Sequence, residues 1–144
     1  MIWRRPPYRI SDDPSDVDLT VVHAFLTTSY WARGIPIATV ARGISHSLPF
    51  SLFLEDRQIG FARVVTDRAT FAYLADVFVA EAHRGRGLAR WLVETALDHP
   101  ELHGLRRWLL VTRDAHGLYR KLGFTDVSDP STLLTRHDPD VYAR

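Results

Sequence analysis

The chain has 144 residues, 18 basic and 17 acidic side chains, and 46% hydrophobic residues. This composition indicates one folded domain and excludes an intrinsically disordered chain. The chain has no cysteine, which excludes a disulfide framework, a thiolate metal site and a covalent cysteine intermediate. Because no apolar stretch follows the charged N-terminus and no long uncharged stretch occurs, we expect a cytoplasmic protein without a membrane segment.

The first third of the chain predicts a short strand followed by two helices. Residues 1–7 contain two consecutive prolines and are expected to form a tail, after which residues 8–11 open a strand. Apolar residues at three- and four-residue spacing predict a helix from Leu19 to about Gly34. A second helix is expected to begin at Pro36 and to be closed by Pro49.

The middle of the chain predicts three consecutive strands. Residues 50–55 and 59–66 have β-like composition and are separated by three polar residues, which indicates a hairpin. Residues 70–79 predict a third strand whose two faces are both mostly apolar, so we expect it to be buried on both sides within a sheet. Asp76 is the one charged residue of that strand.

The last third alternates helices and strands. We expect a helix over residues 87–98, a buried strand over 108–111, and a short helix that Asp114 caps and Gly123 ends. A strand over 124–127 and a weaker candidate over 131–135 follow. The predicted order is β-α-α-β-β-β-α-β-α-β, an α/β fold with a mainly antiparallel sheet flanked by helices. We expect a single domain over residues 8–136, with tails at 1–7 and 137–144.

A glycine-bearing turn between the third strand and the following helix is the most informative feature. The sequence there is Arg84-Gly85-Arg86-Gly87-Leu88-Ala89. A helix N-terminus presents free amides, and glycines remove side chains that would keep a phosphate at a distance, so this turn predicts an anion site. The turn lacks the third glycine of a dinucleotide-binding fingerprint and the Gly-Lys-Ser/Thr of a P-loop. The two flanking arginines favour a diphosphate group.

The turn resembles the Arg/Gln-x-x-Gly-x-Gly/Ala signature of the GNAT family, the acyl-CoA-dependent N-acetyltransferases. Asp76-Val77-Phe78-Val79 resembles the splayed fourth strand of that family. Residues 115–124 resemble its later Ala-x-x-Leu-Tyr-x-x-x-Gly-Phe segment. The motifs occur in the family order and at roughly the family spacing, and the resemblance covers about residues 8–136.

The resemblance implies an enzyme that moves an acetyl group from acetyl-CoA to a primary amine, on a small molecule rather than a protein. Tyr119 would be the general acid that protonates the departing thiolate. The amide of Val77 would polarise the thioester carbonyl. Where the family often has asparagine, this chain has Thr112, whose hydroxyl can still contact the pantetheine arm. The residues implied to contact acetyl-CoA are Val77, Phe78, Val79, Arg84, Gly85, Arg86, Gly87, Leu88, Ala89 and Thr112.

The base that takes a proton from the amine is open between several groups. Burial in an apolar strand would raise the pKa of Asp76 toward the working range, which would make it a candidate base, but it is equally a candidate structural carboxylate. His23 and His46 could line an acceptor pocket, although each is more typical of a partly exposed histidine. The aromatic run at residues 29–34 is either an acceptor rim or the edge of the core.

Other functions are less consistent with the sequence. A non-catalytic acyl-CoA-binding module of the same fold is the alternative to an enzyme. Residues 84–121 carry eight basic and four acidic side chains, but no aromatic and basic platform supports binding to nucleic acid. His99 and His103 flank a proline that breaks their helical spacing, so we expect no metal. We expect acetyl-CoA and an amine as the binding partners. We expect the protein itself to be a monomer or a homodimer.

Overall fold

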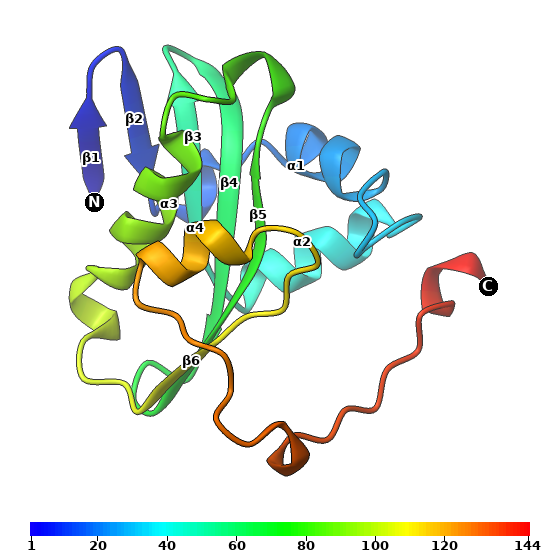
Figure 1. Ribbon diagram of the computed structural model, residues 1–144. Coiled ribbons are helices and arrows are strands. Elements are labelled where there is room, and N and C mark those ends of the chain that lie inside the picture. The colour runs from blue at the N-terminus through cyan, green and yellow to red at the C-terminus, as the bar shows by residue number, and fades with distance from the viewer. The chain divides into compact units, whose positions relative to one another are not determined.

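The computed structural model describes all residues 1–144, which form two compact units, Met1–Val111 and Thr112–Arg144. The first unit contains a six-stranded sheet in the order β1-β2-β3-β4-β5-β6 (Figure 1). Its strands are β1 (Ile2–Arg5), β2 (Tyr8–Ser11), β3 (Leu48–Leu54), β4 (Arg57–Thr66), β5 (Phe71–Val79) and β6 (Arg107–Leu109). Neighbouring strands are antiparallel except β5 and β6, which are parallel. The expected mixed α/β fold with a mainly antiparallel sheet is confirmed.

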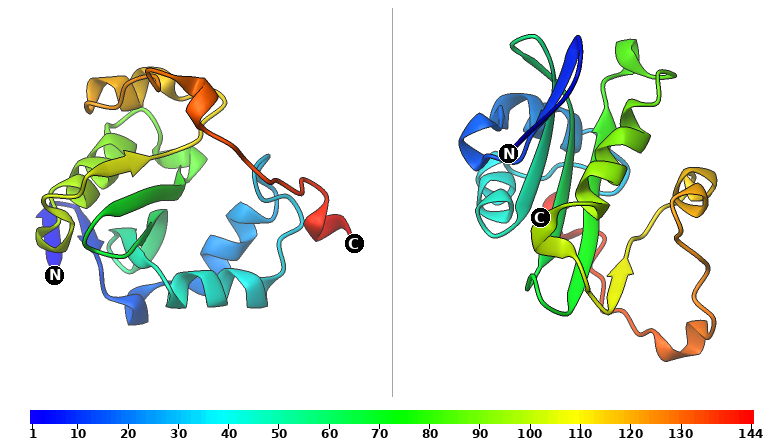
Figure 2. Two further views of the ribbon diagram at one scale, coloured as in Figure 1. Left: turned by 90° about the horizontal axis from the view of Figure 1, so that it is seen from below. Right: turned by 90° about the vertical axis from the view of Figure 1, so that its left-hand side faces the viewer.

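Three helices cover the two faces of this sheet. Helices α1 (Leu19–Leu26) and α2 (Ile37–Ser45) lie on one face, and α3 (Leu88–Leu97) lies on the other (Figure 2). Apolar side chains that lie between these layers form the core, because both faces of a covered sheet exclude water. The largest fully buried ones are Phe50, Phe61, Ile10, Leu26, Leu52 and Leu92.

Local sequence signals set most helix ends, with some differences from expectation. The Asp18 side chain accepts a hydrogen bond from the Val21 amide and caps α1. This helix ends at Leu26, earlier than predicted, and the Ser29 hydroxyl bonds to the Leu26 carbonyl just beyond it. Pro36 is the N-cap of α2, and Pro49 lies inside β3 instead of closing the helix.

The prediction of an N-terminal tail over residues 1–7 is wrong, because Ile2–Arg5 forms β1. This strand pairs with β2 across the Pro6–Pro7 turn, in register from Ile2↔Ser11 to Arg5↔Tyr8. The prolines lie in the turn, where no ladder hydrogen bond is required of them. The Trp3 ring packs at 6.1 Å from the Phe50 ring, which ties the edge strand to the core.

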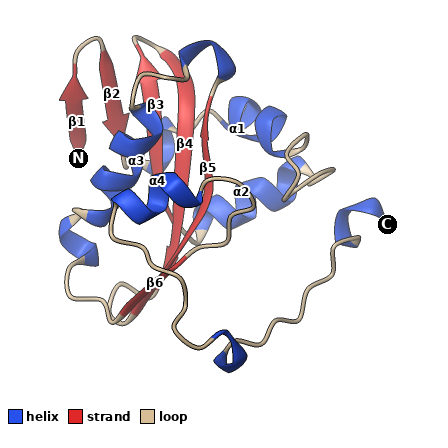
Figure 3. Cartoon of the chain, viewed as in Figure 1, coloured by secondary structure: helices blue, strands red, loops and turns tan.

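The second unit contains helix α4 (His116–Lys121) and no strand, as the colouring by secondary structure shows (Figure 3). The strands predicted at 124–127 and 131–135 are therefore wrong. The Phe124 ring packs edge-on against Tyr119 with centroids 5.9 Å apart, and Asp126 pairs with Arg120 at 2.8 Å. Pro130–Thr132 forms a 3-10 turn. Asp114 is not the helix cap, since Ala115 occupies that position without a side-chain bond.

Candidate active site

Strand β5 carries a β-bulge at Asp76. Phe61 pairs with Phe78 and Arg63 pairs with Ala75, so two residues of β5, Asp76 and Val77, face one residue of β4. Asp76 has φ 57°, in the left-handed region that few residues other than glycine adopt and that aspartate tolerates better than most. A bulge bends the strand and changes the direction of the groups on it. It therefore sets the orientation of the Asp76 side chain and of the Val77 amide.

The edge of β5 that faces β6 is open over most of its length. Strand β6 pairs only with the beginning of β5, from Phe71↔Arg107 to Tyr73↔Leu109. From Leu74 to Val79 no strand lies beside this edge. Unpaired strand edges accept extended chains through main-chain hydrogen bonds, so this edge can take an extended ligand that carries amide groups.

The turn after β5 presents a row of unbonded amides. The six backbone N–H groups of residues 85–90 form no hydrogen bond within the protein, and the first helical bond of α3 runs from the Trp91 amide to the Gly87 carbonyl. Gly85 and Gly87 have φ 80° and 74°, a region that glycine adopts without steric cost. A Cβ added at either glycine would meet nothing within 4 Å. The turn is thus an open cradle with the partial positive charge of a helix N-terminus.

Two arginines that were predicted to contact the anion also hold the cradle in place. Arg84 donates from Nε to the Val79 carbonyl at 2.9 Å, which joins the turn to the end of β5. Arg86 donates to the Tyr8 hydroxyl at 2.9 Å, which joins the turn to the β1–β2 hairpin. Both side chains remain exposed, so each keeps further donors available for an anion.

Asp76 lies in a polar cluster, which corrects the expectation of an apolar environment. Its Oδ2 accepts from Arg63 Nε at 2.8 Å and its Oδ1 accepts from the Trp31 indole at 3.0 Å. Arg63 also donates to the Ser47 hydroxyl at 3.0 Å. The Arg63 and Asp76 side chains are 22% and 12% exposed, so the pair is largely buried. The carboxylate keeps free lone pairs, since each oxygen accepts one hydrogen bond from the protein.

Sequence reasoning did not identify Arg63. The available signal was a single charged residue within an apolar strand, since Ile59–Val65 is otherwise uncharged. A charge in such a position needs a partner when it is buried. The partner could not be assigned from the sequence, because it depends on the bulge register between β4 and β5.

Strand β5 is less buried than predicted. Phe71 is 37% exposed, and Tyr73, Ala75 and Val77 on the same face are half-buried. Burial and the nearby Asp76 carboxylate raise the pKa of Tyr73 above its ordinary value, since both disfavour the phenolate. The residues of β5 that follow the bulge, Phe78 and Val79, are buried.

Aromatic rings from the α1 region adjoin the Asp76 cluster. Phe25 stacks on Phe78 with centroids 4.0 Å apart and an interplanar angle of 7°, and Trp31 packs 6.1 Å from Phe25. Trp31 is 41% exposed, so a ring face remains accessible beside the carboxylate. Trp31, from the aromatic run at residues 29–34, therefore lies beside Asp76. His23 instead lies 3.0 Å from the Ile35 carbonyl, which accounts for it structurally, and His46 is exposed.

Thr112 and Tyr119 both belong to the second unit. The Thr112 hydroxyl accepts from the Ala115 amide at 3.1 Å and so supports the turn that precedes α4. The Tyr119 amide bonds to the Ala115 carbonyl in the first turn of this helix. Gly123 has φ 94° and ends the helix, as expected.

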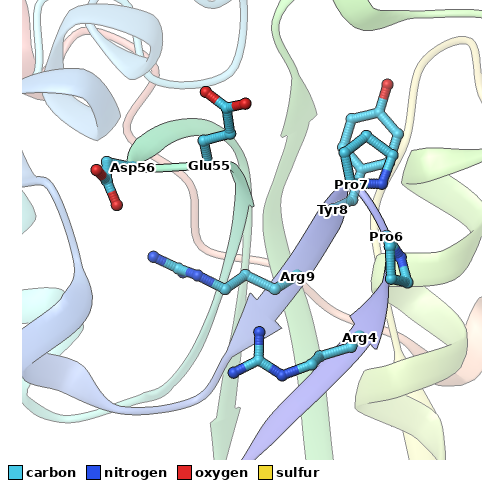
Figure 4. A pocket seen from close by; sticks show the side chains of 7 residues that line it. All are labelled: Arg4, Pro6, Pro7, Tyr8, Arg9, Glu55 and Asp56. Atoms are coloured by element: carbon cyan, nitrogen blue, oxygen red, sulfur yellow. The ribbon is translucent and has the colours of Figure 1, made fainter.

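A separate shallow pocket lies between the β1–β2 turn and the β3–β4 turn (Figure 4). It is lined by Arg4, Pro6, Pro7, Tyr8, Arg9, Glu55 and Asp56. Arg4 and Arg9 are cross-strand partners, and Arg9 also lies over the Phe53 ring at 4.1 Å. None of the predicted site residues lines this pocket.

The fold and the unbonded amides of residues 85–90 are consistent with an anion site, and comparison with known proteins shows the family of this chain. The model of the acetyltransferase (GNAT) family matches residues 10–124. A curated protein of Gibberella zeae assigned as an acetyltransferase is 30% identical over 148 aligned positions, which cover 86% of this chain and 82% of that protein. This chain belongs to the GNAT acetyltransferase family.

Solved structures extend the comparison. The crystal structure of a protein from Xanthomonas campestris pv. campestris, assigned to the GNAT acetyltransferases, is 46% identical with a TM-score of 0.94, covering 98% of this chain and 100% of that one. A Clostridium acetobutylicum structure with acetyl-CoA is 14% identical with a TM-score of 0.66, covering 95% and 96% of the two chains. This second likeness shows the fold alone. The expectation of an N-acetyltransferase enzyme is confirmed.

The family uses acetyl-CoA as its substrate, and the residues present here fit that molecule. The unbonded amides and the open space before Gly85 and Gly87 suit a diphosphate.

No helix of the chain is long and apolar enough to cross a membrane.

Proposed function

We propose that this enzyme transfers an acetyl group from acetyl-CoA to a primary amine, on a small molecule rather than a protein, by direct attack of the amine. One observation carries the proposal: the open edge of β5 leads directly into the unbonded amides of residues 85–90. An extended amide-bearing arm that ends in a diphosphate matches both features in this order.

The main chain of this protein performs the binding. The amides of residues 85–90 hold the diphosphate, and the edge from Leu74 to Val79 pairs with the amide groups of the pantetheine arm. The bound thioester supplies the activated acetyl group. The Val77 amide, turned by the bulge, donates to the carbonyl oxygen and stabilises the negative charge that develops there during attack.

Two side chains move the protons. Asp76 accepts a proton from the attacking amine, and Arg63 and Trp31 hold its carboxylate beside the bulge. Tyr119 donates its phenolic proton to the sulfur as the carbon–sulfur bond breaks, so that the coenzyme leaves as a thiol. The amine attacks the thioester directly, which is consistent with a chain that has no cysteine to carry the acyl group.

The test measures release of free thiol from acetyl-CoA against a panel of small primary amines, their quaternary analogues and a lysine-containing peptide. We expect thiol release and an acetylated product, detected by mass spectrometry, with small primary amines alone. If acetyl-CoA raises the melting temperature but no amine releases thiol, the chain is a binding module and the catalytic proposal is wrong. If acetyl-CoA does not bind, the cradle assignment fails as well.

A further inference from the structure

The loop between α1 and α2 orders Trp31 by its own hydrogen bonds (Figure 1). The Gly34 amide donates to the Thr27 carbonyl at 2.8 Å and closes this loop. Inside it, the Ala32 amide donates to the Ser29 hydroxyl at 3.1 Å. The loop therefore places the Trp31 ring before any ligand binds, and a ligand does not have to order it.

The indole of Trp31 is polarised by a carboxylate. Its Nε1 donates to Asp76 Oδ1 at 3.0 Å, while the Arg63 guanidinium is held at the other oxygen, Oδ2. This charge-assisted hydrogen bond draws the N–H proton toward the anion and leaves more electron density on the ring. The face of an indole already carries partial negative charge and binds cations better than other aromatic rings do. The Trp31 face therefore favours a cation, whereas an anionic ligand would be repelled.

Trp31 and Tyr30 form a corner that solvent reaches, called here the aromatic corner. Their ring planes meet at 80° with centroids 5.1 Å apart, and the two residues are 41% and 43% exposed. Two rings at nearly a right angle can contact one cationic group from two sides. The two arginines that stack on rings in this protein lie over Trp91 and Phe53, so neither of them covers Trp31.

We propose, on the basis of the acetyl transfer proposed above, that the amine acceptor carries a second cationic group, which binds at the aromatic corner while the reacting nitrogen lies at Asp76. Because Asp76 itself contacts the Trp31 indole, a group bonded a few atoms from the reacting nitrogen reaches the ring. Only the reacting nitrogen changes during transfer. It forms the carbon–nitrogen bond and loses its proton to Asp76, while the carbon–sulfur bond breaks and Tyr119 protonates the sulfur. The second group keeps its charge throughout.

Two amines of the same shape test the role of the charge. The first is aminopropyl-trimethylammonium, which carries a permanent positive charge, and the second is its carbon analogue with a tert-butyl group in place of trimethylammonium. Release of free thiol gives kcat/KM for each amine, expressed per unprotonated amine because the permanent charge lowers the pKa of the reacting nitrogen. We expect the charged amine to be preferred by about 5- to 30-fold, as for a cation–π contact that is partly removed from water.

Substitutions at Trp31 locate the effect. Trp31→Leu should remove most of the preference, and Trp31→Phe should keep part of it because a ring remains. Trp31 also holds Asp76, so absolute rates fall for both amines, whereas the ratio between the two amines reports the contact with the ring. Phe71→Leu is the matched control, because Phe71 is a 37% exposed aromatic residue at the beginning of β5, before the bulge. Its ratio should equal that of the wild type.

Equal kcat/KM values for the two amines, or a preference for the tert-butyl amine, would overturn the proposal. So would a Trp31→Leu variant that keeps the wild-type ratio. A third amine with a phenyl group at the same position tests stacking, and its preference over the charged amine would show that the aromatic corner takes a ring instead of a cation. In each of these results thiol release itself shows that acetyl transfer stands. Absence of thiol release with every amine would refute the proposed function, and the second cation site with it.

Discussion

Gly87→Asp tests the anion cradle directly, and Gly104→Asp is a matched control. Both glycines have left-handed backbone, with φ 74° and 76°, and a Cβ at either position would meet nothing within 4 Å. The two substitutions therefore carry the same backbone strain, about 1–2 kcal/mol at most for a residue type that tolerates this region. We expect both variants to fold and to lose a similar amount of stability in urea denaturation.

The two variants should differ in acetyl-CoA binding. A carboxylate at position 87 lies within the row of unbonded amides and can occupy them itself. Repulsion between this carboxylate and one phosphate charge at about 5 Å amounts to about 1–3 kcal/mol for effective dielectric constants between 80 and 20. Repulsion alone should thus weaken binding by about 5- to 150-fold, and occupation of the amides adds to this loss. Gly104→Asp should bind like the wild type.

Isothermal titration calorimetry at two salt concentrations is the assay. The repulsive part of the loss should shrink at high salt, because ions screen exposed charges. A folded Gly87→Asp variant with wild-type affinity would refute the cradle, since a diphosphate held by these amides cannot share the space with a carboxylate. Equal losses in both variants would show that backbone strain, and not the anion site, controls binding.

Four further predictions concern the two proton-transfer groups, the arginine that pairs with Asp76, and one surface carboxylate. Asp76→Asn should lower turnover by about 10²- to 10⁴-fold and keep acetyl-CoA affinity, as expected for removal of a base. Arg63→Met should instead lower the free energy of unfolding by about 1–3 kcal/mol, because it leaves a largely buried carboxylate without its ionic partner. Near-normal turnover of Asp76→Asn would reduce Asp76 to a structural carboxylate that fixes Trp31. Tyr119→Phe should lower turnover with little change in affinity, and an acyl donor with a better leaving group should restore part of the rate; full activity would exclude the general-acid role. The Thr70 hydroxyl and nearby amides hold the pKa of Asp67 well below its ordinary value of 3.8. Asp67→Asn should therefore be less stable than the wild type at neutral pH, and this difference in stability should shrink as the pH falls below about 4. Urea denaturation at pH 7 and pH 3 measures the difference, with a substitution of an exposed carboxylate, Asp56→Asn, as control.

The direction of the Asp67 effect follows from proton binding. In the unfolded chain this carboxyl takes up a proton at a higher pH than in the folded protein. Acid therefore favours the unfolded state. The stabilisation is fully present above the unfolded pKa and declines as the pH falls toward the lowered pKa of the folded protein. A difference between wild type and Asp67→Asn that stays constant from pH 7 to pH 3 would contradict the proposed hydrogen-bonded turn.

Local sequence determined the elements that a short window of chain can specify. The strand, the two glycines and the helix that make the cradle lie within residues 71–97, and their geometry depends on backbone preferences that neighbouring residues set. The amphipathic spacing of α2 and α3 and the meander of β3, β4 and β5 were predictable for the same reason. The family motif was recognisable because it consists of such local pieces.

Only the tertiary structure decided which distant side chains meet. Asp76 bonds to Trp31, 45 positions away, and Arg86 bonds to Tyr8, 78 positions away. The Arg63 contact depends on one extra residue in β5, and a shift of one residue would turn each side chain to the opposite face. β1 and the missing strands after α4 show the same limit. A strand forms only where another backbone supplies its hydrogen bonds, and the sequence of a segment does not say whether that partner is present.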